Sequence, residues 1–180
     1  MYPIQIIAAF DKYLAQNNLQ FTAIVVGGCA LALMKLITRE TQDVDVLEPK
    51  IPQEILNRAH DFANQWNQVN RDVLKINWLN NGPASLQRDL PINWHKRVEL
   101  IFQGKSLTLY TLCRSDLLIS KLFAYCDRVI DKNDCIQLNP AREELLTTFE
   151  WVKELDGNPL WPAHVEAMFK DLAKELGYEL

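Results

Sequence analysis

A short β-branched run that ends in two glycines and continues into an apolar segment constrains the fold most. Residues 22–26 (TAIVV) predict a buried strand, because β-branched side chains favour the pleated backbone. Gly27 and Gly28 end this run, and residues 29–37 are apolar almost all round, which predicts a buried helix straight after the glycines. This order predicts a mixed α/β core.

The next strand carries two carboxylates. Residues 43–47 (DVDVL) alternate between polar and apolar, so Asp43 and Asp45 are expected to point to the same face. Two negative charges this close are costly unless something compensates them, and paired carboxylates are hard oxygen ligands suited to Mg²⁺ or Mn²⁺. Gly27 and Gly28 have no side chains, so a phosphate could approach the backbone there and meet the amides of the following helix. Together these features predict a site for a metal-bound nucleoside triphosphate.

The remaining patterns divide the chain into an α/β half, residues 1–112, and a helical half, residues 113–180. The lack of a Ser/Gly-rich linker near residue 113 favours two closely packed halves. In the first half we expect helices over 3–17 and 52–67, a strand within 69–79 and a hairpin of 97–102 with 106–112. In the second half Ser115 is expected to cap a helix over 116–127, followed by helices over 131–138, 141–155 and 162–176.

Composition narrows the class of protein. The chain has 180 residues, and 48% of them are hydrophobic, which is enough for a real core. A net charge of -4 argues against non-specific or sequence-specific DNA binding, although it leaves room for a local basic groove. We expect no membrane span and no secretory signal, and the four cysteines lack metal-ligand spacing. These features favour a cytoplasmic protein with reduced thiols.

The two motifs together resemble the signature of the nucleotidyltransferase superfamily, which has the polymerase-beta-like fold. The resemblance is closest to a branch of abortive-infection toxin-like and uncharacterised nucleotidyltransferase-like proteins. Their pattern is GG-x-A-L followed by R-x-T-x-D-[VI]-D, and the matching residues are 27–31 and 39–45. The resemblance spans residues 20–140 and implies an α/β (α+β) fold, in which a small mixed β-sheet is flanked by helices and followed by a helical C-terminal part.

The resemblance also implies roles for individual residues. Glu99 is the expected third metal ligand beside Asp43 and Asp45, with Asp89 as a less favoured substitute. Lys121 is expected to be catalytic, and it lies seven residues before Arg128, which would place both cations on one helix face. The residues expected to bind the nucleotide are Gly27, Gly28, Arg39, Thr41, Arg128 and Asp134. Gln137 stands where relatives often carry a second acid, which puts retained catalysis in question.

The leading hypothesis is a metal-dependent nucleotidyltransferase. It would move an NMP from an NTP, with Mg²⁺ or Mn²⁺, to a hydroxyl of an RNA such as tRNA or of a protein, in a toxin-like role that implies an antitoxin partner. One alternative is a binding module of a toxin–antitoxin or regulatory system that has kept the fold and lost catalysis. Another is a metal-dependent phosphohydrolase that uses the same acids and delivers the phosphoryl group to water.

Overall fold

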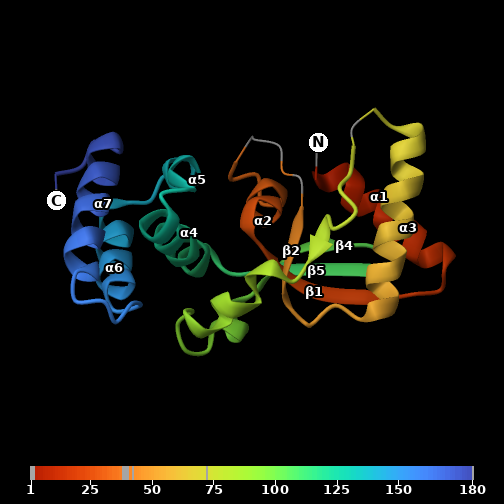
Figure 1. Cartoon of the computed structure of the whole chain (residues 1–180), viewed down its shortest axis with the longest axis horizontal. Coiled ribbons are helices and arrows are strands. Elements are labelled where there is room, and N and C mark those ends of the chain that lie inside the picture. The colour runs from red at the N-terminus through yellow and green to blue at the C-terminus, as the bar shows by residue number, and fades with distance from the viewer. Residues whose placement is uncertain (1–2, 38–40, 42, 72, 180) are drawn as a thin grey trace. The chain divides into compact units, whose positions relative to one another are not determined.

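The computed structural model describes residues 3–37, 41, 43–71 and 73–179. The chain folds into two compact units (Figure 1). The first, called the α/β unit below, comprises Met1–Arg88 and His95–Leu112. The second, the helical unit, comprises Asp89–Trp94 and Cys113–Leu180.

The α/β unit is built on a mixed sheet. Its elements are α1 (Pro3–Gln16), β1 (Phe21–Val26), α2 (Gly27–Leu33), β2 (Val44–Glu48), α3 (Gln53–Val69), β3 (Leu79–Asn80), η1 (Gly82–Arg88), β4 (Glu99–Gln103) and β5 (Leu107–Thr111), with η2 (Trp94–Arg97) running into it. Among the described residues the strand order is β3-β2-β1-β5-β4. The β1–β5 and β2–β3 pairs are parallel, whereas β1–β2 and β4–β5 are antiparallel. The predicted fold class, a small mixed sheet flanked by helices, is therefore confirmed.

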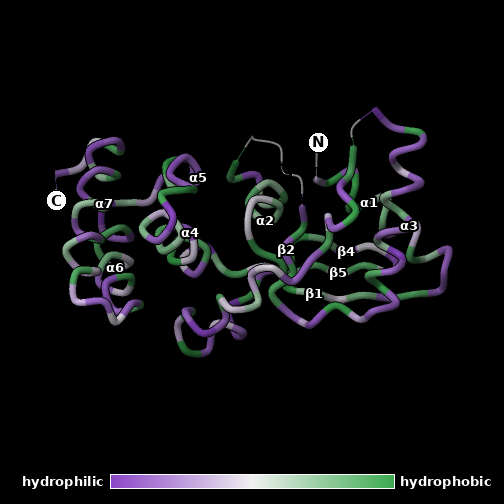
Figure 2. Tube along the Cα trace, in the orientation of Figure 1, coloured by the Kyte–Doolittle hydropathy of each residue, from purple (hydrophilic) through white to green (hydrophobic). Residues whose placement is uncertain are grey.

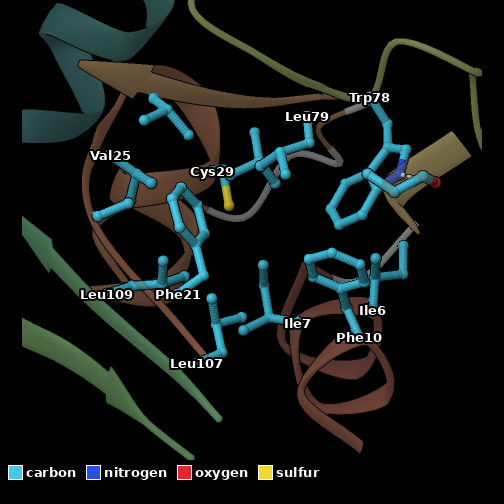
Figure 3. Close-up of a cluster of buried hydrophobic side chains, with 14 of the residues drawn as sticks. Ile6, Ile7, Phe10, Phe21, Val25, Cys29, Trp78, Leu79, Leu107 and Leu109 are labelled. Atoms are coloured by element: carbon cyan, nitrogen blue, oxygen red, sulfur yellow. Dashed lines mark hydrogen bonds between the residues drawn. The ribbon is translucent and has the colours of Figure 1, made fainter. Parts of the chain in front are cut away.

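One face of this sheet carries the hydrophobic core. Alternate strand residues, such as Val25 on β1 and Leu109 on β5, are buried together with residues of α1, α2 and α3. Figure 3 shows Phe10 of α1 beside Trp78, and their rings meet edge to face with centroids 5.0 Å apart. The Trp78 indole also donates a hydrogen bond to the Ala59 carbonyl of α3, at 3.0 Å. These contacts hold α1 and α3 on the same face.

The hydropathy of α3 agrees with its place against the core (Figure 2). The α3 helix is mostly hydrophilic, with buried residues Ile55, Ala59, Phe62 and Ala63 at helical spacing. That spacing gives one apolar stripe, which lies against the core, while the rest of the helix meets solvent.

The opposite face of the sheet is more exposed to solvent than the core face. The β1–β2 register pairs Val26 with Asp45 and Ile24 with Glu48, around an irregularity at Leu47. Paired residues point to the same side of a sheet, and Ile24 alternates with the buried Val25. Asp45 and Glu48 therefore lie on the face opposite the core, which we call the outer face.

Three predicted elements differ in detail. The expected strand within 69–79 is only Leu79–Asn80, because the Asn67 side chain binds both the amide and the carbonyl of Leu74, at 2.7 and 2.8 Å, and a turn follows. The α2 helix begins at Gly27 itself and ends at Leu33. The α4 helix begins at Arg114, so Cys113 rather than Ser115 is its N-cap residue.

The helical unit contains α4 (Arg114–Arg128), α5 (Lys132–Leu138), α6 (Arg142–Lys153) and α7 (Trp161–Glu175). Its buried residues include Leu117, Leu122, Leu145, Val152, Val165, Phe169 and Leu172. Arg114 links α4 to the later helices, since it donates to the Leu138 carbonyl at 2.6 Å and pairs with Glu144 at 3.2 Å. Within the described residues, every helix is too short or too polar to cross a membrane.

Candidate functional site

The Asp45 carboxylate fits against Gly27. Gly27 has a φ of +72°, and a Cβ built on it would lie 2.7 Å from Asp45 Oδ2. On its other side, Asp45 Oδ1 is 3.9 Å from where a Cβ of Gly82 would be. The carboxylate thus lies between two glycines from different turns. A side chain at Gly27 would collide with this carboxylate, and the expected phosphate contact of Gly27 stays a prediction.

Asp43 lies beside the start of α2. It lines a small hollow with Thr41 and Cys29. Thr41 is buried, and its hydroxyl donates a hydrogen bond to the backbone carbonyl of Asp43 at 3.2 Å. The predicted nucleotide ligand Thr41 therefore fixes the backbone of an acid, with its hydroxyl engaged inside the protein.

The thiol of Cys29 lies within the electrostatic influence of both acids, Asp43 and Asp45. Burial, together with the negative charges of Asp45 and Asp43, raises the pKa of its thiol to about 12. Both carboxylates therefore act on the same point at the beginning of α2. Such a concentration of negative charge favours a cation.

The carboxylates of Asp43 and Asp45 are suitable ligands for Mg²⁺. Mg²⁺ is commonly held by one or two carboxylates, with water and substrate phosphates completing its shell, rather than by an all-protein cage. Asp43 and Asp45 could supply such a pair. In the part of the chain that the structure describes, no three His, Cys, Asp or Glu side chains gather to hold a metal ion.

The third predicted ligand, Glu99, lies elsewhere on the sheet. It is exposed on β4, which is separated from β2 by β1 and β5. Glu99 pairs with Thr111, and Thr111 pairs with the core residue Val25. The register therefore directs Glu99 to the face opposite that of Asp45. Arg39, expected to bind the nucleotide, falls outside the described residues.

Two predicted residues of the helical unit, Lys121 and Asp134, form a buried ion pair. Lys121 is 6% exposed, and its Nζ lies 2.8 Å from Asp134 Oδ2 and 3.1 Å from Asp131 Oδ2. Arg128, in contrast, is exposed, with its Nε 3.7 Å from Asp127. The two cations therefore do not form one solvent-facing surface. Gln137 is exposed on α5.

Asn80 is a neighbour of Asp45 that was not among the predicted site residues. It pairs with Asp45 in the β2–β3 register, and its side-chain oxygen accepts a hydrogen bond from the Gly82 amide at 2.6 Å. This bond shapes the turn that brings Gly82 to Asp45. Residues 80–83 (NNGP) are typical of a turn, but the pairing of Asn80 with β2 does not follow from the sequence alone.

Comparison with known proteins identifies the family of this chain. No curated protein and no solved structure gives a significant match to this chain. A protein family described as "Nucleotidyltransferase of unknown function (DUF6036)" matches residues 4–142, which include the glycine turn, both acids and the Lys121–Asp134 pair. Because this match covers more than half of the sequence, the chain belongs to that nucleotidyltransferase family of unknown function.

Proposed function

We propose that this protein is a metal-dependent nucleotidyltransferase that moves an NMP from an NTP to a hydroxyl acceptor. The observation that carries the proposal is the fit of the Asp45 carboxylate between Gly27 and Gly82, with Asp43 two residues earlier on the same segment. Membership of the family supports the same reaction class. The acceptor would be an RNA end or a protein side chain in the cytoplasm, and a toxin-like role would add an antitoxin partner.

Asp43 and Asp45 would hold the metal ion. When bound, Mg²⁺ or Mn²⁺ supplies positive charge that offsets the triphosphate and the developing pyrophosphate. In the transfer, the acceptor oxygen forms a bond to the α-phosphorus and the bond from that phosphorus to the bridging oxygen breaks. Pyrophosphate leaves, and the acceptor proton passes to water.

The other predicted residues have supporting roles in this proposal. Gly28 and Arg39 would contact the phosphates. Lys121 and Arg128 belong to the helical unit, where Lys121 is held by Asp134. A lysine held in one position by a buried carboxylate is suited to a fixed electrostatic role. Glu99 stays a predicted ligand, and the reaction as proposed requires only Asp43 and Asp45 from the chain.

Binding and transfer can be tested with one set of variants. Calorimetry would measure the affinity for each Mg²⁺·NTP, and labelled NTPs incubated with RNA and protein from a lysate would report transfer. We expect Asp43→Asn and Asp45→Asn each to abolish transfer and to weaken Mg²⁺·NTP binding. Asp61→Asn is the matched control, because Asp61 is an exposed acid on α3. Equal Mg²⁺·NTP affinity and transfer in the wild type and both site variants would refute the proposal.

A nucleotide-binding module without transfer is the second candidate. The observation that favours it is that Glu99 lies on the other face of the sheet from Asp45. Tight Mg²⁺·NTP binding that requires Asp45, with no product in the labelled assay, would support the module over the enzyme. A labelled product formed with water alone would instead indicate a phosphohydrolase.

A further inference from the structure

The outer face of the sheet carries a pocket of about 620 Å³. All of its lining residues belong to the α/β unit. Ile24, Val98 and Tyr110 supply apolar surface, and Tyr110 adds an aromatic ring. Its volume lies within the range of about 300–1,000 Å³ that is typical of small-ligand sites. The pocket is therefore large enough for a nucleoside.

The pocket is next to Asp45 on the outer face of the sheet. Ile24 lines the pocket, and Val26, two residues further along β1, pairs with Asp45. Two residues of a strand span roughly 7 Å. Asp45 and Ile24 also share the outer face, so a group seated in the pocket could reach a phosphate held at Asp45.

The order of features along β1 favours the acceptor over the donor. In an in-line transfer the acceptor and the pyrophosphate occupy opposite sides of the α-phosphorus. The glycine turn at residues 27–28 follows Val26, whereas the pocket begins before it. If the triphosphate extends toward the glycines, the acceptor approaches from the pocket.

Polar groups at the pocket suit a base and its phosphates. Glu48 lines the pocket, and its carboxylate is 3.1 Å from His95 Nε2, so it is held in place as a hydrogen-bond acceptor for a base. Lys50 also lines the pocket and is exposed. Lys96, exposed on η2, lies two residues before the lining residue Val98. Cations beside an aromatic, apolar pocket are typical of single-stranded nucleic-acid binding.

We propose that this pocket binds the nucleoside that bears the acceptor hydroxyl, and that the acceptor is therefore an RNA end rather than a protein side chain. This inference rests on the proposed function, because the acids define where the transfer takes place. A flat base would lie on Tyr110 with its edge toward Glu48, and the preceding phosphates would meet Lys50 and Lys96.

Binding of free ribonucleosides to the full chain would be followed through the NMR methyl signals of Ile24 and Val98. We expect at least one of the four ribonucleosides to shift both signals. Thr22 is exposed and lines the pocket, so Thr22→Trp should fill it and weaken nucleoside binding by about tenfold. Mg²⁺·NTP binding, measured on the same variant, should be unchanged. Thr147→Trp, at an exposed position on α6, is the matched control and should bind like the wild type.

The outcomes separate the pocket from the acids. If Mg²⁺·NTP binds to the wild type but no ribonucleoside shifts Ile24 or Val98, the pocket proposal is overturned and the proposed function stands. Shifts produced by N-acetyltyrosinamide instead of nucleosides would also overturn it, in favour of a protein acceptor. Nucleoside shifts without any Mg²⁺·NTP binding would support a nucleoside site and overturn the proposed function. The wild-type measurement decides the matter even if Thr22→Trp fails to fold.

Discussion

Gly27 and Asp45 are fitted to each other: a Cβ on Gly27 would lie 2.7 Å from Asp45 Oδ2. Gly27→Ala should therefore displace the carboxylate and also strain the backbone at φ +72°. A left-handed conformation costs an L-residue about 1–2 kcal/mol, so we expect at least that loss in the free energy of unfolding. We also expect weaker Mg²⁺·NTP binding. Urea denaturation and calorimetry would measure the two effects.

Gly157→Ala is the control for this substitution. A Cβ on Gly157 would meet nothing within 4 Å, and its φ is not in the left-handed region. It should therefore leave both measurements unchanged. Normal Mg²⁺·NTP binding by a folded Gly27→Ala protein would show that the fit of Gly27 to Asp45 is not needed for the site.

The secondary-structure elements around the candidate site could be predicted from the sequence. The β-branched run, the glycines and the alternating acids are short-range patterns, and each defines its own element. The structure has β1, α2 and β2 in that order, with Asp45 against Gly27. The order of these elements was therefore predictable from the sequence, whereas the roles of Asp43 and Asp45 as metal ligands stay predictions.

The long-range part could not be predicted in the same way. Glu99 reads as a strand residue, but its face depends on the pairing of β4 with β5 and of β5 with β1. Strand order and register are set by contacts far apart in the chain, and a shift of one residue reverses every face. Lys121 was expected to share a helix face with Arg128, whereas it is buried against Asp134 of α5, a contact between helices that helical spacing alone does not predict.

Asp11 anchors the loop between β4 and β5. Its carboxylate is 8% exposed and accepts hydrogen bonds from the amides of Lys105, Ser106 and Leu107, at 3.2, 2.8 and 2.8 Å. Asp11→Asn replaces one acceptor oxygen with a donor. Because hydrogen bonds to charged groups contribute about 1.5–3 kcal/mol each, we expect a loss of at least that size at neutral pH. Urea denaturation measures it.

The same carboxylate predicts a pH dependence. Burial raises the pKa of Asp11, but the amide hydrogen bonds, first from Ser106, lower it more, so the folded-state pKa lies below the ordinary value of 3.8. Its contribution to stability is complete above the unfolded pKa and is lost as the pH falls through the folded pKa. The difference between wild type and Asp11→Asn should narrow over that range, with Asp61→Asn as the control. A difference that does not change with pH would contradict this explanation.

The cysteines should differ in reactivity. Burial raises the pKa of Cys29 and of Cys126 to about 12, and it also raises that of Cys135, whereas Cys113 is only half-buried. The thiolate is the reactive form, so iodoacetamide at about pH 8 should modify Cys113 first in the folded protein. Mass spectrometry of the peptides measures this order. In urea all four should react, and equally fast modification of Cys29 in the folded state would show that its surroundings open readily.

Lys121 should be critical for the stability of the helical unit. Its ammonium is buried with the carboxylates of Asp134 and Asp131 at 2.8 and 3.1 Å, so Lys121→Met would leave buried negative charge without its cation. Removing one partner of a buried ion pair typically costs about 3–5 kcal/mol. Urea denaturation followed by circular dichroism would measure this loss.

Lys170→Met is the matched control, because Lys170 pairs with Glu166 at 2.7 Å with both side chains exposed, and it should change stability little. The double variant Lys121→Met/Asp134→Leu should recover part of the loss, because it removes one of the stranded charges. If the double variant is no more stable than Lys121→Met, the loss arises from packing of the lysine stem and not from the ion pair.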